Sequence, residues 1–182
     1  MKIITISAHA QNGKDFTAGI IKSKLEQSGN KVLIAHYADL LKYICSTFFE
    51  WDGKKDEKGR TKLQYVGTDI IRKQRPNYWV DFVLGILEMF PDEWDYVIIP
   101  DTRFPNENDT FKEKGFDIAT LRVVIPNFDN GLTEEQKNHE SEVALDDYDF
   151  DYMLINNGDE TIYNEIDKFL DWLHSEEGQN NE

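Results

Sequence analysis

The chain has 182 residues, of which 40% are hydrophobic and 30% are charged, a composition typical of a globular domain rather than a disordered chain. Its 20 Lys and Arg residues face 35 Asp and Glu residues, and the net charge of −15 argues against nucleic-acid polymers and anionic membranes as partners. Cys45 is the single cysteine, which excludes an internal disulfide and cysteine-cluster metal sites. Since no apolar run reaches the roughly 18 residues of a membrane span, and Met1–Ser7 shows no signal-peptide pattern, we expect a cytoplasmic protein.

The N-terminal segment alternates strand and helix. Residues 2–7 are apolar and predict a buried strand, a helix ends near Gly29, and residues 31–36 predict a second strand. The helix carries apolar residues at helical spacing, namely Ala18, Ile21 and Leu25. Strand, helix and strand in this order imply a parallel pair with a right-handed crossover.

A mostly helical insert follows at about residues 37–91. Helical spacing of apolar residues recurs near residues 40–48, from Leu63 until Pro76, and over residues 80–87. Residues 53–62 are charged and punctuated by glycine, and they predict an exposed loop.

The second half continues the alternation, with strands predicted at 96–99, 118–125 and 152–155 and helices at 106–114 and from Asp159. Residues 126–147 are polar and acidic, and a loop of this length is typical of a lid. The polar tail from Ser175 is expected to fray. The order predicts one three-layer α/β domain over residues 1–182 with a mainly parallel five-stranded sheet, whose ligand lies beyond the carboxyl ends of the strands.

The first such loop, residues 8–15, approximates the phosphate-binding pattern Gly-x-x-x-x-Gly-Lys-Ser/Thr. Ala8 stands for the first glycine and Asp15 for the hydroxyl residue. Backbone N–H groups and the following helix N-terminus would hold a phosphate chain, with Lys14 on its outer phosphates. The candidate phosphate-binding residues are Ala10, Gln11, Asn12, Gly13, Lys14, Asp15 and Phe16. The alternative is a plain strand-to-helix turn with a solvated Lys14.

The loop after the third strand carries Asp101 and Arg103 at the same expected edge. The carboxylate suits Mg²⁺ or an attacking group, and the guanidinium suits a pair of phosphate oxygens. The alternative is a structural Asp–Arg turn pair.

Six segments then form a recognisable series: Gly13–Asp15, Ala38–Lys42, Leu63–Thr68 with Arg72, Asp101–Glu107, His139–Glu142 and Asn156–Gly158. In this order they resemble the deoxynucleoside-monophosphate kinases of tailed bacteriophages, within the P-loop nucleoside-monophosphate kinase group. The resemblance covers residue 3 to about residue 170. It implies a P-loop kinase fold and Mg²⁺-dependent transfer of phosphate from ATP to a nucleoside monophosphate.

The resemblance also implies roles for individual residues. Lys14, Asp101 and Arg103 would be catalytic, Asp15 and Asp101 would hold Mg²⁺, and Asn157 would lie by the adenine of ATP. The acceptor nucleotide would be held by Asp39, Thr68, Arg72, Arg75, Trp79, Arg103 and Glu107. Thr68, Arg72 and Arg75 share a helical face at spacings of four and three. Their chemistry alone also allows other roles. Arg75 could equally be exposed to solvent, Asp39 could cap a helix, and Trp79 could belong to the core.

The chain departs from the family pattern at two points. Phe16 stands where the family usually has Thr, and the only cations at the lid are Arg122 before it and Lys137 within it. The group that stabilises the transferring phosphoryl is therefore left open. Two alternatives also stay open: another small-molecule kinase, resembling dephospho-coenzyme A kinase, and a nucleotide-binding protein without turnover. The preferred base and a homodimer are not decided by the sequence.

Overall fold

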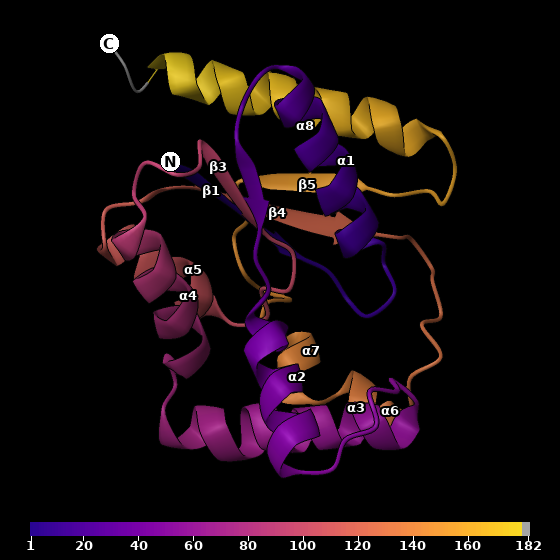
Figure 1. Ribbon diagram of the computed structural model, residues 1–182. Helices are drawn as coiled ribbons and strands as arrows, with labels where there is room; N and C mark the ends of the chain where they lie inside the picture. Colours follow the sequence, from indigo (N-terminus) through magenta and orange to yellow (C-terminus); the bar gives the residue numbers. More distant parts are fainter. Residues whose placement is uncertain (180–182) are drawn as a thin grey trace.

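The computed structural model describes residues 1–179 (Figure 1). Its elements in chain order are β1 (Lys2–Ser7), α1 (Lys14–Gln27), β2 (Val32–Ile34), α2 (Tyr37–Phe48), α3 (Glu57–Gln64), the π-helix η1 (Tyr65–Arg72), α4 (Tyr78–Met89), β3 (Tyr96–Ile99), α5 (Pro105–Glu113), β4 (Asp117–Val124), α6 (Glu134–Lys137), α7 (Glu140–Val143), β5 (Tyr152–Ile155) and α8 (Thr161–Gln179). Within these residues no helix is both long and apolar enough to cross a bilayer.

The sheet has the strand order β2-β3-β1-β4-β5, and every pair is parallel. β1 lies at the centre, with Thr5 opposite Ile99 of β3 and Ser7 opposite Arg122 of β4. All six β1 residues are buried, as expected for a strand covered on both faces. The carboxyl ends of all five strands therefore meet at one edge, and the predicted parallel five-stranded sheet is confirmed.

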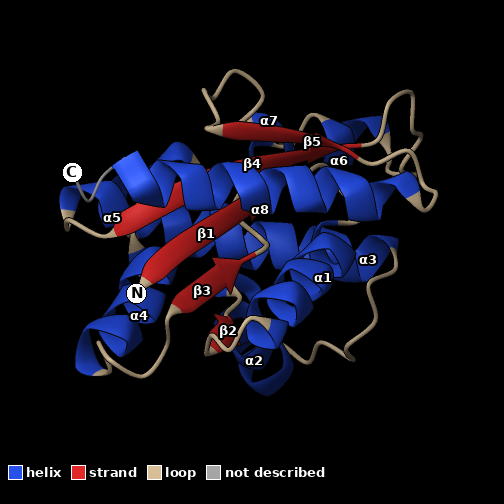
Figure 2. Ribbon diagram, turned by 90° about the horizontal axis from the view of Figure 1, so that it is seen from above, coloured by secondary structure: helices blue, strands red, loops and turns tan. Residues whose placement is uncertain are grey.

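Alternation along β1 separates two apolar cores. Ile4 and Ile6 face the core beneath α1 and α8, which lie over the strands in Figure 2. Ile3 points to the opposite face, where Phe111 of α5 and the apolar residues of α4 cover the sheet. Helices on both faces make the three layers.

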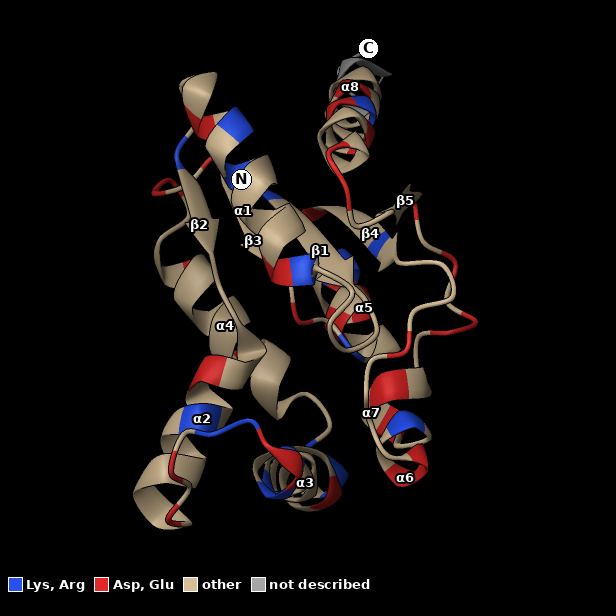
Figure 3. Ribbon diagram, turned by 90° about the vertical axis from the view of Figure 1, so that its right-hand side faces the viewer, with Lys and Arg blue, Asp and Glu red and all other residues tan. Residues whose placement is uncertain are grey.

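The insert and the lid lie together beyond the carboxyl edge of the sheet. In Figure 3, α2 and α4 stand on one side and α6 and α7 on the other, with α3 between them. Lid residue Gln136 is buried, and its Nε2 donates to the Glu57 carbonyl and the Thr61 hydroxyl of α3, each at 3.4 Å. The lid therefore packs against the insert.

Three predicted segments differ from the structure. The predicted loop at 53–62 contains the start of α3, because Asp56 caps the helix by accepting from the Gly59 N–H at 2.9 Å. The lid holds two short helices, and α6 begins with a capping box between Thr133 and Gln136. α8 continues past Ser175 to Gln179, so the predicted fraying is wrong for residues 175–179, and the remainder of that tail lies outside the described residues.

Candidate active site

The loop between β1 and α1 is shaped by Gly13 and anchored by two asparagines. Gly13 has a φ of +83°, and a Cβ there would lie 2.6 Å from Asn156 Nδ2, so only glycine fits. Asn156 Nδ2 donates to the Asn12 carbonyl at 3.3 Å, and Asn12 Oδ1 accepts from the Ile125 N–H at 2.7 Å. These amides tie the loop to the ends of β4 and β5 and pre-organise its backbone N–H groups.

A cleft of about 540 Å³ opens beside this loop. The structure places Lys14 and Asp101, from segments far apart in sequence, on its walls. The sequence-predicted residues that line it are Ala10, Gln11, Lys14, Asp15, Thr68, Arg72, Trp79, Asp101, Arg103 and Glu107. The phosphate loop, the β3–α5 loop, the insert and the lid therefore share one cavity.

Two predicted acceptor residues lie outside this cleft. Asp39 binds Lys42 within α2, with 2.7 Å between Oδ1 and Nζ. Arg75 lies on a separate surface with Tyr78. It follows the end of the helix that carries Arg72, and its N–H donates to the Ile71 carbonyl at 2.8 Å. Thr68 and Arg72, both within η1, line the cleft together. Asp39 and Arg75 therefore do not line the cleft with the other predicted acceptor residues, and their roles stay predictions.

Four residues predicted to bind ATP also do not line the cleft. Asn12 and Gly13 belong to the framework of the loop described above. Phe16 is 55% exposed and meets Tyr163 of α8 edge to face, with ring centroids 6.5 Å apart. Asn157 is exposed and donates to the Thr161 hydroxyl at 3.2 Å, which supports the turn before α8.

Asp101 fixes the start of the insert. Its Oδ1 accepts from the Tyr37 N–H at 3.1 Å and its Oδ2 from the Ala38 N–H at 2.8 Å. A carboxylate at the first turn of a helix also favours the positive end of the helix dipole. Asp101 thus connects the end of β3 to α2, a contact that the sequence did not predict.

Asp15 lies between two basic groups. Its Oδ2 is 2.7 Å from Lys14 Nζ, and its Oδ1 is 3.5 Å from His36 Nε2. Hydrogen bonding to His36, then to Lys14, holds the pKa of Asp15 well below its ordinary value. Reciprocally, the hydrogen bond to Asp15 and the charges of Asp101 and Asp39 raise the pKa of His36. The sequence did not single out His36 as a site residue. Its position at the end of the second predicted strand could have done so, because ligands bind beyond the carboxyl ends of parallel strands.

Asp15 and Asp101, which the resemblance assigns to Mg²⁺, are two of the four carboxylates that line the cleft. In kinase sites this ion usually takes one or two carboxylates together with phosphate oxygens and water. Two carboxylates that line the same cleft fit that requirement. Across residues 1–179 there is no group of three or more His, Cys, Asp and Glu side chains arranged to hold an ion by themselves.

Arg72 and Glu107 form a buried ion pair at the back of the cleft. The Arg72 guanidinium binds Glu107 Oε1, donates to the Asn106 side chain at 3.1 Å, and stacks 3.8 Å above the Phe104 ring. Glu107 Oε2 accepts from the N–H groups of Arg103 at 2.7 Å and Phe104 at 3.1 Å. Burial raises the pKa of Glu107, and the Arg72 charge opposes that rise.

Arg103 connects the cleft to the lid through Glu142. Its guanidinium binds Glu142 Oε1 and donates to the Ser141 carbonyl at 2.9 Å. The other oxygen of Glu142 accepts from the Ala10 N–H of the phosphate loop at 3.2 Å. The Glu142 side chain is only 6% exposed, so a lid carboxylate is held between a loop N–H and a cleft arginine.

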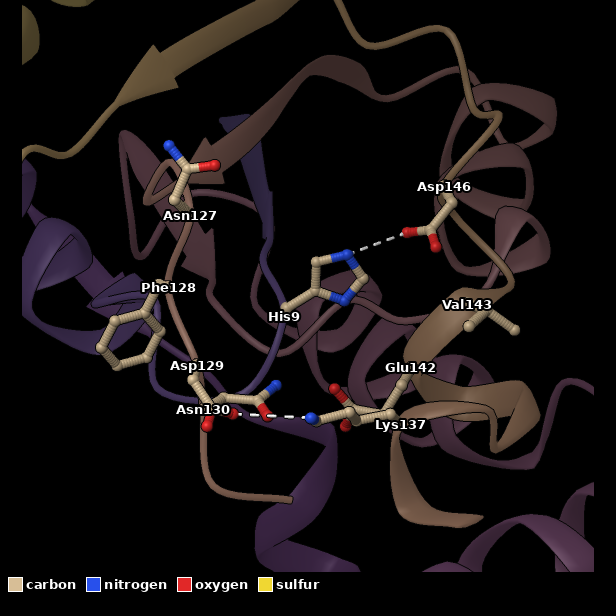
Figure 4. Close-up of a pocket in the computed structure, with 9 residues that line it drawn as sticks. All are labelled: His9, Asn127, Phe128, Asp129, Asn130, Lys137, Glu142, Val143 and Asp146. Atoms are coloured by element: carbon tan, nitrogen blue, oxygen red, sulfur yellow. Dashed lines mark ion pairs between the residues drawn. The ribbon is translucent and has the colours of Figure 1, made fainter. Parts of the chain in front are cut away.

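A second cavity of about 460 Å³ lies behind Glu142, between the two arms of the lid (Figure 4). His9 lies between Asn127 on one arm and Asp146 on the other, with Nε2 3.2 Å from Asp146 Oδ1. Arg122 is buried below, where it binds Asp146 at 2.8 Å and the Ser7 hydroxyl at 2.8 Å. Arg122 does not line the cleft and connects the sheet to the lid.

The comparisons with known proteins agree with this geometry. The family model for deoxynucleotide monophosphate kinase matches residues 51–166. The chain belongs to the deoxynucleotide monophosphate kinase family. It is 28% identical over 178 residues to the deoxynucleotide monophosphate kinase of Enterobacteria phage T4, covering 93% of this chain and 67% of that protein. Over 114 residues it is 30% identical to the kinase of Escherichia phage RB69, covering 61% and 44% of the two chains.

Among solved structures, an APS kinase of Mycobacterium tuberculosis has a TM-score of 0.52 at 11% identity, covering 95% of this chain and 96% of that one. This likeness concerns the fold and confirms the predicted P-loop kinase architecture. Membership of the deoxynucleotide monophosphate kinase family confirms the family and enzyme class predicted from the sequence.

Proposed function

We propose that the protein transfers the γ-phosphoryl group of ATP directly to the 5′-phosphate of a deoxynucleoside monophosphate. The observation that carries this proposal is the shared cleft, which Lys14 of the phosphate loop lines together with Arg103 and the insert residue Thr68. Such a cleft brings two phosphorylated ligands together, and positioning supplies much of the rate of phosphoryl transfer.

On the donor side, Lys14 and the backbone N–H groups around Ala10 bind the phosphates of ATP. The N-terminus of α1 adds a partial positive charge at the same point. The Lys14 side chain is 18% exposed, so its charge acts in a partly desolvated site where it is screened less than at the surface.

On the acceptor side, the insert contributes Thr68 and an apolar wall. Trp79 is 5% exposed and its Nε1 donates to the Gly67 carbonyl at 3.1 Å, which fixes its ring beside the cleft. Leu41 and Leu63 line the same region and suit the flat face of a base. Arg72, held by Glu107, and Arg103 supply positive charge to the acceptor phosphate.

Asp15 and Asp101 would hold Mg²⁺, which neutralises charge on the phosphate oxygens when it is bound. The lid excludes water, because Gln136 and Ser141 close the cleft over the insert. Excluding water protects ATP from hydrolysis while the acceptor is in place.

A coupled ADP-release assay across all ribo- and deoxyribonucleoside monophosphates, with and without Mg²⁺, tests the proposal. We expect ADP release that requires a deoxynucleoside monophosphate and Mg²⁺. Arg103→Ala should abolish that release while leaving the unfolding transition in place. ADP release with no monophosphate, or only with an acceptor that lacks a nucleoside, would refute the proposed substrate class.

A further inference from the structure

Most cations of the cleft already have a carboxylate partner. The pairs are Lys14 with Asp15, Lys42 with Asp39, Arg72 with Glu107 and Arg103 with Glu142. Two further cations line the same cleft, Lys55 and Arg60 from the segment that the sequence predicted to be an exposed loop. Neither forms an ion pair with any residue between 1 and 179.

The position of Lys55 is electrostatically unfavourable in the protein alone. Lys55 lines the cleft with a side chain that stays exposed to solvent, and partial desolvation together with the nearby charges of Lys42 and Lys14 lowers its pKa. Arg60 Nε donates a hydrogen bond to the Lys55 carbonyl at 3.0 Å. The two terminal amino groups of its guanidinium have no partner in the described part of the chain. An unpaired ammonium held beside other cations gains free energy when an anion binds.

The segment that carries Lys55 is fixed rather than loose. Trp51 Nε1 donates to the Lys54 carbonyl at 3.0 Å, and Lys62 Nζ donates to the Phe49 carbonyl at 2.7 Å. A Cβ at Gly59 would lie 1.9 Å from the Lys54 carbonyl oxygen, so the close approach of α3 to this loop requires glycine. In Figure 3 the loop is the blue segment that leads into α3. Pre-organisation of this kind lowers the entropy cost of holding a ligand.

The lid cannot supply these charges itself. Lys137 binds Glu134 at 3.1 Å and Asp129 at 3.5 Å, and it lines the cavity behind Glu142 rather than the cleft (Figure 4). Arg122 is buried against Asp146. The charge that a lid arginine would bring to the phosphates is therefore absent from the described lid.

We propose that Lys55 and Arg60 form a phosphate clamp that binds the phosphoryl group during transfer, in place of lid arginines. The inference rests on the proposed function and adds to it the residues that stabilise the moving group. No acid or base chemistry is required of them, since both act as fixed positive charges and hydrogen-bond donors.

The test compares Lys55→Met and Arg60→Met with Lys58→Met, a matched control because Lys58 is exposed on the same helix as Arg60. We expect each clamp variant to lower kcat by about 100-fold or more, with KM for both substrates changed much less. Lys55→Arg should recover part of the rate, and all variants should keep the wild-type unfolding transition. A clamp variant with kcat within about twofold of wild type, or an equal loss in Lys58→Met, would overturn the proposal.

Binding of ADP with aluminium fluoride, which imitates the phosphoryl group in transfer, separates this inference from the proposed function. We expect the wild-type protein to bind ADP more tightly with aluminium fluoride than without it, and the clamp variants to lose that gain while retaining affinity for ADP. If no monophosphate gives turnover but this gain depends on Lys55, the proposed function fails and the clamp stands. A gain that is absent from the wild type, or unchanged in Lys55→Met, overturns the clamp.

Discussion

Substitution Glu107→Gln tests the buried pair that supports the acceptor side. Glu107 is 2% exposed and Arg72 is 8% exposed, so the substitution leaves a buried guanidinium without its counter-ion. It also replaces one acceptor oxygen with a donor beside the N–H groups of Arg103 and Phe104. Breaking one partner of a buried ion pair costs about 3–5 kcal/mol. At about 2–4 °C per kcal/mol for a domain of this size, we expect a fall in Tm of about 6–20 °C.

Thermal and urea unfolding followed by circular dichroism measure this loss. The matched control is Glu113→Gln, an exposed position on the last turn of α5, where a change below about 0.5 kcal/mol is expected. If Glu107→Gln unfolds like the control and instead loses affinity for the nucleoside monophosphate, then Glu107 contacts the acceptor directly and the structural reasoning is refuted.

Three further predictions concern the phosphate side of the cleft. Lys14→Ala should reduce ADP release by at least about 100-fold without shifting the unfolding transition, and a smaller loss would remove Lys14 from the donor phosphates. His36→Gln should destabilise the protein most between pH values of about 4 and 6.5. The raised pKa of His36 gives stability that is lost as pH rises through it, and the lowered pKa of Asp15 gives stability that is lost as pH falls through it; a Tm difference from wild type that does not vary with pH would contradict this. Glu142→Gln should tighten ATP binding in calorimetry by about tenfold, because a charge-assisted bond of about 1.5–3 kcal/mol no longer competes for the same donors. Glu140→Gln, exposed on the same short helix, is the control, and equal affinities would exclude such competition.

The sheet was predictable because each strand is marked by a short run of apolar residues in its own sequence. Tyr96–Ile99 and Tyr152–Ile155 appear in the structure at the predicted bounds. Tyr96–Ile99 is buried throughout and reads as an apolar run, whereas Tyr152–Ile155 is a partly exposed edge strand whose apolar residues stand between polar segments. Parallel order then follows from short connections and right-handed crossovers. The edge at which Lys14, Asp101 and Arg103 meet could therefore be inferred before any contact was known.

The rest of the site depends on contacts between distant segments. Arg72 and Glu107 are 35 residues apart, and Arg103 and Glu142 are 39 residues apart, so spacing alone could not pair them. The segment containing Lys55 has the composition of a solvated loop, and in the structure it packs closely against Gly59 of α3 and Lys55 lines the cleft.

Local geometry also overrode one pattern. The face shared by Thr68, Arg72 and Arg75 assumed a regular helix that continues through Arg75. The helix ends before Arg75, so of these three residues Thr68 and Arg72 line the cleft and Arg75 does not.

Under the proposed function, a phosphate that binds the loop would replace the carboxylate of Glu142. Its two oxygens hold the Ala10 N–H and Arg103, so a nucleotide that takes over these donors must free the helix that bears Glu142. The Ala10 N–H and the Arg103 guanidinium would then have an anionic partner both before and after the exchange. When the product leaves, the carboxylate of Glu142 would bind the Ala10 N–H and Arg103 again as the phosphate departs.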